Sequence, residues 1–286
     1  LPPRSAQFPA RVEQLKAHIE RVDRQTEQLR APEFPAGKDW FNSPPLTFGK
    51  QLAGKITVLD FWTYCCINCI HILPDLAELE ERYAGYPVAF VGVHSAKFDN
   101  EKVSENIRDA VLRYEIAHPV VNDDTMHMWQ RIGVRSWPSM AVVGPKGNLM
   151  LMVSGEGNKE LIDACITAAL AFYPKELFRH DPIPMSPEKD KLRIDSPLRY
   201  PSKLAIDTEG ERLFISDSSH HRIVVTDLDG RFIDTIGSGR IGLADGGYDE
   251  AQFFRLQGLS YHDGSLYVAD DEVKPFLAFF LAVFSL

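Results

Sequence analysis

One stretch decides the fold of this chain: Asp60-Phe-Trp-Thr-Tyr-Cys65-Cys66-Ile-Asn-Cys69. It joins an apolar, β-branched run over residues 56–61 to a helix-like run over residues 70–83. A C-x-x-C sequence at such a junction places its first thiol at the start of the helix, where unpaired backbone N–H groups favour the thiolate. The second thiol lies within one turn and can attack a mixed disulfide. The pattern therefore indicates thiol–disulfide exchange, with Cys66 as nucleophile and Cys69 as resolving cysteine.

The residues around this stretch alternate between strand-like and helix-like runs. Strands are predicted at residues 56–61, 88–93, 119–121, 140–143 and 149–153, and helices at residues 70–83, 101–114, 126–132 and 158–172. This alternation predicts an α/β domain with helices on both faces of its sheet. An amphipathic helix over residues 9–30 precedes the domain, and we expect Val12, Leu15, Ile19 and Val22 to form its docking stripe.

The composition excludes several classes of protein. The chain has 31 Lys+Arg against 40 Asp+Glu, a formal net charge of -9, which argues against a general nucleic-acid binder. With 44% hydrophobic and 25% charged residues it is typical of a globular protein. Four cysteines are too few for a disulfide-stapled scaffold. The apolar run over residues 276–286 is too short to span a bilayer, which takes about 20 helical residues. It is either a buried strand or a non-native tail, and we favour the tail.

A different pattern follows a proline-rich stretch over residues 174–197, which we expect to be a semi-rigid linker. Four short strands are predicted at residues 204–207, 212–217, 222–227 and 231–236. The pattern then restarts, since residues 256–261 echo residues 201–206 and residues 265–270 echo residues 212–217. A repeating four-strand unit is typical of a propeller blade, and a propeller needs about four blades to close.

These patterns predict five segments. They are an N-terminal helix and lead-in loop (residues 1–45), an α/β domain (46–173), a Pro-rich linker (174–197), a partial propeller of one and a half blades (198–271) and an apolar, non-native tail (272–286). Because the second blade is incomplete, we expect a chain cut from a longer protein.

Four features in register resemble the thioredoxin-like family: the Asp60-Phe-Trp run, the C-x-x-C, Pro74, and Val134-Arg-Ser-Trp-Pro138. The resemblance covers about residues 46–172 and implies a thioredoxin-like fold, a central mixed sheet flanked by helices. It also implies that Asp60 is the buried acid that moves protons during exchange. Pro138 is then a cis-proline that faces the C-x-x-C, with Trp62 and Trp137 as the other substrate-binding candidates.

The second region resembles NHL repeats in Asp217-Ser-Ser-His220-His221-Arg222-Ile223, with His220 in place of the usual Asn. The resemblance implies an incomplete all-β NHL propeller segment that binds protein partners. We interpret His220 and His221 as turn residues and not as metal ligands, because adjacent residues of a strand face opposite sides.

The cysteine stretch departs from the thioredoxin pattern. Cys65 stands where thioredoxins carry Trp, and Ile67-Asn68 replaces Gly-Pro, so the reduction potential does not follow from the resemblance. Cys65, Cys66, Cys69 and His71 look like a zinc ligand set, but adjacent thiols at a helix start point apart and no second pair exists. We therefore expect no metal and no cofactor.

Two hypotheses stay open. In the first, the chain is a thiol–disulfide oxidoreductase, a monomer whose partners bind the thioredoxin-like groove and the NHL blades. In the second, it is a non-enzymatic interaction protein whose thioredoxin-like domain is catalytically idle. The resemblance implies a cytosolic location, while the acidic charge and the short apolar run predict no nucleic-acid partner and no membrane span.

Overall fold

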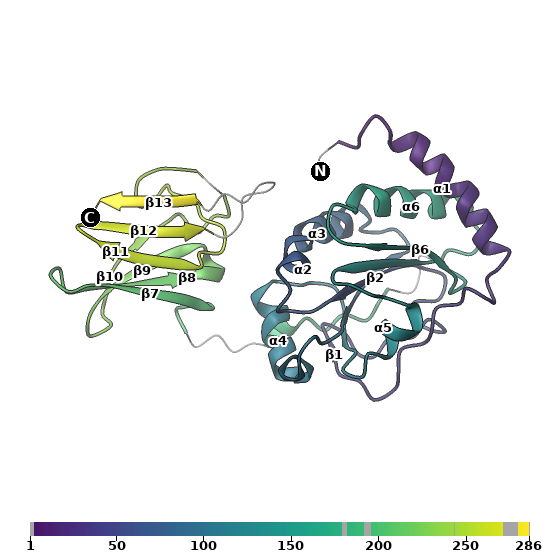
Figure 1. The fold of residues 1–286 in the computed structure, drawn as a ribbon, viewed down its shortest axis with the longest axis horizontal. Helices are drawn as coiled ribbons and strands as arrows, with labels where there is room; N and C mark the ends of the chain where they lie inside the picture. Colours follow the sequence, from purple (N-terminus) through teal and green to yellow (C-terminus); the bar gives the residue numbers. More distant parts are fainter. Residues whose placement is uncertain (1–2, 179–181, 192–195, 243, 271–279, 286) are drawn as a thin grey trace. The chain divides into compact units, whose positions relative to one another are not determined.

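The computed structural model describes residues 3–178, 182–191, 196–242, 244–270 and 280–285. The chain divides into two compact units, Leu1–Leu192 and Arg193–Leu286. Each unit contains its own β-structure (Figure 1). The first unit has an apolar cluster on each face of its sheet, and the second unit has a separate cluster.

The first unit is built on a mixed sheet of six strands in the order β1-β4-β3-β2-β5-β6. The strands are β1 (Trp40–Phe41), β2 (Ile56–Trp62), β3 (Val88–His94), β4 (Val120–Asn122), β5 (Ser139–Val143) and β6 (Leu149–Ser154). β2, β3 and β4 are parallel to one another, whereas β1, β5 and β6 pair antiparallel with their neighbours. This confirms the mixed sheet that the thioredoxin-like resemblance implies.

Helices cover both faces of this sheet, as the alternating pattern predicts. They are α1 (Phe8–Asp23), α2 (Ile67–His71), α3 (Leu73–Arg82), α4 (Ser104–Arg113), α5 (His127–Ile132), α6 (Lys159–Phe172) and a 3₁₀ turn, η1 (Asp99–Lys102). α1, α3, α4 and α6 contribute to the core on one face, and α5 packs on the other. α1 lies along α6 (Figure 1) and buries the stripe of Val12, Leu15, Ile19 and Val22.

The central strand β2 positions the acid of the candidate site. Val58 and Trp62 belong to the core under α3 and α6, whereas Leu59 and Phe61 belong to the opposite core. Because successive side chains of a strand point to opposite faces, Asp60 shares the face of Val58 and Trp62.

The helix that follows the cysteines differs from the prediction. The sequence predicts one helix over residues 70–83, but α2 begins at Ile67 and the chain breaks at Ile72 before α3. The cause is Pro74, which has no N–H to continue the hydrogen-bond pattern of α2. Pro74 lies instead in the first turn of α3, where a backbone N–H would have no partner within the helix, so its absence costs nothing.

Part of the proline-rich segment is bonded to the first unit. The N–H of Ser186 donates to the backbone oxygen of Asn42 at 2.7 Å, and the N–H of Glu188 donates to Asn42 Oδ1 at 2.9 Å. Glu188 opens the short helix α7 (Glu188–Lys191) and forms an ion pair with Arg108 at 3.1 Å. These contacts explain why the first unit extends to Leu192.

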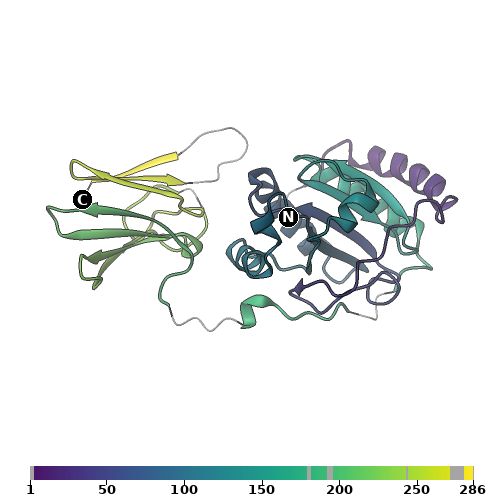
Figure 2. The ribbon, with the colours of Figure 1, turned by 60° about the horizontal axis from the view of Figure 1, so that its bottom comes forward.

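The second unit contains two antiparallel sheets, ordered β10-β9-β8-β7 and β11-β12-β13. The strands are β7 (Pro201–Asp207), β8 (Arg212–Asp217), β9 (Arg222–Asp227), β10 (Phe232–Ile236), β11 (Gly258–His262), β12 (Ser265–Asp270) and β13 (Phe280–Ser285). The two sheets lie against each other (Figure 2) and share one core, to which Phe214, Leu256 and Val268 contribute. Part of the expected tail therefore forms a strand, β13, while residues 271–279 and 286 lie outside the described residues.

One aspartate contact recurs in both copies of the repeat. Asp217, at the end of β8, accepts a hydrogen bond from the N–H of Arg199 at 2.6 Å. Asp270, at the end of β12, accepts one from the N–H of Phe254 at 3.0 Å. Asp217 also bonds His220 and Arg222, so the His220-His221 pair belongs to a structural turn. The shared contact agrees with the repeat that the sequence predicts.

Candidate active site

The cysteine loop begins where β2 ends. Cys66 directly precedes α2, and the N–H of Cys69 donates to the backbone oxygen of Cys66 at 3.0 Å. Cys65 is exposed, Cys66 is half-buried and Cys69 has 0% of its surface exposed, and all three are free thiols. The two thiols of the C-x-x-C therefore lie one helical turn apart, with the first open to solvent and the second closed to it.

The thiol of Cys69 strongly prefers its protonated form. Burial, a side-chain hydrogen bond with Cys66 and the negative charge of Asp60 all raise its pKa. A thiolate is the attacking species in disulfide exchange, so Cys69 needs a base that takes its proton. The electrostatic interaction with Asp60 identifies the nearby group that can do so.

Asp60 is a buried carboxyl with an unusual pKa. It is 2% exposed, and neither carboxyl oxygen has a hydrogen-bond partner among the residues that the structure describes. Burial raises the pKa of Asp60 to about 7. The charge of His118 opposes this shift, and the charge of Glu80 adds to it. The carboxyl can therefore change its protonation state near neutral pH.

Pro138 lies at the end of the sheet from which the cysteine loop starts. The Trp137–Pro138 peptide bond is cis, and the next residue, Ser139, is paired in register with Phe61 of β2. Trp137 is half-buried, and its indole N–H donates to the backbone oxygen of Ser95 at 2.9 Å. Its ring centre lies 4.1 Å from that of Trp129. The polar atom of the indole is thus engaged within the protein.

Trp62 does not line an open groove. It has 0% of its surface exposed, and its ring lies 5.0 Å from the ring of His94. His94 in turn stacks on Tyr64, with ring centres 5.5 Å apart, and burial lowers the pKa of His94 to about 4. Trp62 therefore supports the cysteine loop from within the core, and in this conformation a substrate cannot touch it.

Glu101 braces the cysteine loop, and the sequence reasoning missed it. Its carboxylate has 0% of its surface exposed and accepts hydrogen bonds from the Thr63 hydroxyl and from the backbone N–H of Cys65 at 3.1 Å. Its other oxygen accepts the N–H groups of Lys97 and Phe98 at 2.9 and 3.0 Å. The one signal in the sequence is a glutamate in a short segment after β3, which periodicity alone assigns to a helix start.

The same carboxylate keeps Cys65 protonated. Burial, a side-chain hydrogen bond with Glu101 and the charge of Glu101 raise the pKa of Cys65 to about 11. Cys65 is thus exposed but poor in thiolate at neutral pH, so it competes weakly with Cys66 for a disulfide.

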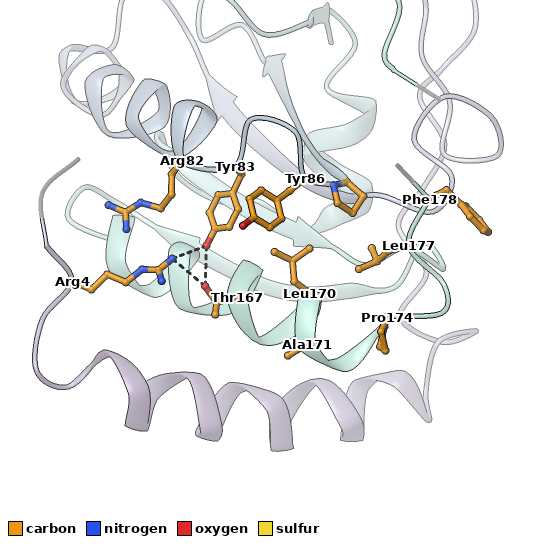
Figure 3. Close-up of a pocket in the computed structure, with 11 residues that line it drawn as sticks. Arg4, Arg82, Tyr83, Tyr86, Thr167, Leu170, Ala171, Pro174, Leu177 and Phe178 are labelled. Carbon is orange, nitrogen blue, oxygen red and sulfur yellow. Dashed lines mark hydrogen bonds between the residues drawn. The ribbon is translucent and has the colours of Figure 1, made fainter. Parts of the chain in front are cut away.

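The cysteine loop lies away from the cavity of the first unit, and the described residues around it form no metal site. Among the described residues no group of three or more His, Cys, Asp or Glu side chains is placed to bind a metal ion. A cavity of about 860 Å³ lies elsewhere in the first unit (Figure 3), and no residue of the cysteine loop lines it. Arg4, Tyr83 and Thr167 form a hydrogen-bonded group at one end of it, and Leu170 and Leu177 line the apolar end.

The comparison with protein families fits this geometry. Residues 54–149 match a family model described as thioredoxin-like, and they include the cysteine loop, Asp60 and Pro138. The chain carries a thioredoxin-like domain. A thiol:disulfide interchange protein of the thioredoxin family from Chlorobium tepidum TLS is similar in structure. It is 20% identical, with a TM-score of 0.42, and the match covers 49% of this chain and 95% of that one.

Longer relatives extend the similarity beyond the thioredoxin-like domain. The chain is 50% identical over 268 residues to Protein SUPPRESSOR OF QUENCHING 1, chloroplastic, of Arabidopsis thaliana, covering 92% of this chain and 25% of that protein. It is 43% identical over 258 residues to NHL repeat-containing protein 2 of Homo sapiens, covering 89% of this chain and 35% of that protein. The chain thus spans about a third or less of these relatives, and both matches extend into the second unit.

These findings confirm the combination that the sequence predicts, a thioredoxin-like domain in a chain similar to an NHL repeat protein. The thioredoxin-like domain is also related to thiol-disulfide oxidoreductase YkuV of Bacillus subtilis, at 21% identity over 140 residues, 49% of this chain and 93% of that protein. Among the described residues no helix is both long and apolar enough to cross a membrane.

Proposed function

We propose that this chain catalyses thiol–disulfide exchange, in which Cys66 attacks a protein disulfide and Cys69 releases the product. The observation that carries the proposal is the difference in exposure between two thiols one turn apart, half-buried Cys66 and closed Cys69. A disulfide in solution can reach Cys66. Cys69 interacts with the Cys66 side chain, so its natural target is the mixed disulfide on Cys66.

Asp60 serves as the proton acceptor of Cys69 in this proposal. The Cys69 thiol has to lose its proton before it attacks, and the nearby carboxyl has a pKa of about 7. A base with a pKa near the working pH is the most effective kind, because it accepts and returns a proton at little cost.

We place the substrate polypeptide against Trp137 and the backbone beside Pro138, whose own ring is buried. Ser139 pairs with Phe61, so Pro138 lies at the end of the sheet where the cysteine loop begins. Trp137 forms one side of this position with a ring fixed by Ser95 and Trp129. Trp62 contributes only through the core, as its complete burial requires.

We propose that the second unit binds protein partners, and that the protein works in the cytosol. Strand β7 exposes Leu204 and Ile206 on the same face, with 60% and 54% of their surfaces open to solvent. Apolar side chains exposed side by side are typical of surfaces that meet another protein. Apart from the C-x-x-C stretch the chain has one further cysteine, Cys165, and this low cysteine usage agrees with a reducing compartment.

The test is reduction of insulin disulfides by the full chain, with dithiothreitol as the electron source. We expect turnover by the wild type and by Cys65→Ser, and loss of turnover in Cys66→Ser. In Cys69→Ser the reaction should stop at a mixed disulfide between Cys66 and the substrate, which mass spectrometry detects.

The same experiment decides between the two hypotheses that the sequence leaves open. If the wild type reduces insulin no faster than Cys66→Ser, the exchange function is wrong. The thioredoxin-like domain is then an idle support for an interaction protein.

A further inference from the structure

A group of buried polar atoms surrounds Gly92, next to Asp60. Asp60 on β2 and Gly92 on β3 are paired in register. A Cβ atom at residue 92 would lie 3.0 Å from Trp62 Nε1 and 3.2 Å from His118 Nε2. Two ring nitrogens therefore face the small space that the glycine leaves beside the Asp60 carboxyl.

None of these atoms has a hydrogen-bond partner within the part of the chain that the structure describes. This holds for both carboxyl oxygens of Asp60, for Trp62 Nε1 and for His118 Nε2. Four polar atoms with unmet bonding capacity on one face of the sheet are a costly arrangement for a structural core. Such a cost indicates that the group has a role in function.

The other ring nitrogen of His118 connects this group to the surface. His118 Nδ1 lies 2.7 Å from Glu80 Oε1, and the Glu80 side chain is 24% exposed while that of His118 is 5% exposed. His118 thus has one nitrogen towards the interior beside Asp60 and one on a carboxylate that meets solvent.

The charged groups that act on this path are few. His118 and Glu80 act on Asp60, Asp60 acts on Cys69, and Glu80 and Asp60 act on His118. Burial alone would lower the pKa of His118, but the charge and hydrogen bond of Glu80, together with Asp60, raise it above its ordinary value. A raised pKa means that His118 holds a proton more readily than an ordinary histidine, so it is suited to take up the proton of Asp60.

We propose that His118 and Glu80 form the path by which protons pass between Asp60 and solvent during thiol–disulfide exchange. This inference rests on the proposed function. His118 and Glu80 are positioning residues here, because they act on the reacting thiols only through Asp60.

Every proton and electron pair of the resolving step has a donor and an acceptor. The S–H proton of Cys69 passes to the Asp60 carboxylate, and the Cys69 thiolate attacks the Cys66 sulfur of the mixed disulfide. The Cys66–Cys69 bond forms, and the substrate sulfur leaves with the electron pair as a thiolate. The substrate disulfide is reduced and the two protein thiols are oxidised. When the Asp60 carboxyl and an unprotonated His118 Nε2 come into hydrogen-bond contact, the proton passes to Nε2, and the resulting imidazolium gives its Nδ1 proton to Glu80 and so to water.

The test uses His118→Gln, which keeps a polar side chain but does not titrate, and Glu80→Gln, which keeps an acceptor for His118. The readout is the pH profile of substrate-thiol release from the trapped mixed disulfide. We expect His118→Gln to slow release about tenfold at pH 7 and to move the profile to higher pH, since loss of the cation raises the pKa of Asp60. Glu80→Gln should slow release in the same pH range.

A matched control is His18→Gln, which changes a histidine bonded to the backbone oxygen of Met150. It should leave the rate and the profile unchanged. Unchanged rates and profiles in both His118→Gln and Glu80→Gln would overturn the path.

A second measurement separates this inference from the proposed function. The carboxyl carbon of Asp60, followed by NMR against pH in the reduced full chain, should titrate at higher pH in His118→Gln. This shift does not depend on catalysis, so it tests the coupling even if insulin is not reduced. Glu80→Gln, at a partly exposed site, supplies the answer if His118→Gln fails to fold.

Discussion

The Glu101 carboxylate accepts a hydrogen bond from the backbone N–H of Cys65, with Oε1 3.1 Å from the nitrogen. This contact joins a segment after β3 to the loop that carries the reactive cysteines. Because the carboxylate is buried and also holds Thr63, Lys97 and Phe98, it fixes the loop as a unit. Its negative charge has a second effect, since it holds the neighbouring thiol in the protonated form.

Glu101→Gln should therefore make Cys65 more reactive. Without the carboxylate the pKa of Cys65 falls from about 11 towards its ordinary value, and the thiolate fraction at pH 8 rises. We expect alkylation of Cys65 by iodoacetamide to become about tenfold faster, as measured by mass spectrometry of the labelled peptide. The loss of a buried charged acceptor should also lower the free energy of unfolding by about 2 kcal/mol.

Glu105→Gln serves as the control, because Glu105 is exposed on α4. It should leave alkylation of Cys65 as in the wild type. Equal alkylation rates in Glu101→Gln and the wild type would show that this carboxylate does not govern the thiol.

Asp60 should make stability depend on pH with a definite sign. Its folded pKa of about 7 lies above its ordinary value of 3.8, so the folded state binds more protons between these limits. Stability from this group is complete below about pH 4 and is lost as the pH rises to about 7. The loss is at most about 4 kcal/mol by the standard conversion.

Asp60→Asn stays neutral and should escape this loss. Urea unfolding of the reduced proteins should show an advantage of the variant over the wild type that grows from pH 4 to pH 8. Asp109→Asn, at an exposed carboxyl of α4, should show no such growth. A pH-independent difference for Asp60→Asn would contradict the raised pKa. The variant should also slow the resolving step.

Gly92→Ala should destabilise the first unit by crowding. The added Cβ would meet Trp62 Nε1 and Val120 Cγ2, each at 3.0 Å, as well as His118. We expect the free energy of unfolding to fall by about 1–3 kcal/mol. Gly49→Ala is the matched control, because its nearest atom lies at 3.8 Å. If Gly92→Ala and Gly49→Ala lower the free energy of unfolding equally, the close contacts at residue 92 do not destabilise the protein.

The contacts of residues 173–191 predict where the first unit can be cut. The Tyr173 hydroxyl donates to Asp23 at 2.9 Å and accepts from Asn148 at 3.1 Å, and Glu188 bonds Asn42. A chain that ends at Lys191 should therefore fold, whereas one that ends at Phe172 should lose about 3–5 kcal/mol of stability. Equal urea midpoints for the two chains would show that these contacts contribute little.

Local pattern was sufficient for most elements of the fold. Strands such as β2 and β3 are continuous apolar runs, and α1 has one apolar stripe, so periodicity located them. The strand β1 escaped, because two residues in a proline-rich loop carry no period. The break at Ile72 is not predicted, because the sequence shows that Pro74 interrupts a helix but not that a new helix begins around it.

The candidate site could be predicted only where its residues are close in sequence. The spacing of Cys66 and Cys69 predicts their role, and the family resemblance predicts the roles of Asp60 and Pro138. Glu101, His118 and Glu80 act through contacts between distant segments, such as the 2.7 Å approach of His118 to Glu80. A single sequence contains no signal for such contacts, because charged side chains of this kind also occur throughout exposed helices and loops, where they have no such partner.

The contacts of Asp217 and Asp270 with the backbone have a consequence for how repeats of this kind can be joined. Asp217 holds Arg199, and Asp270 holds Phe254, each within its own copy of the repeat. A copy therefore brings along the contact that closes its own strands. Repeats of this kind placed in tandem therefore need no new contact at this position, because each one already contains both partners.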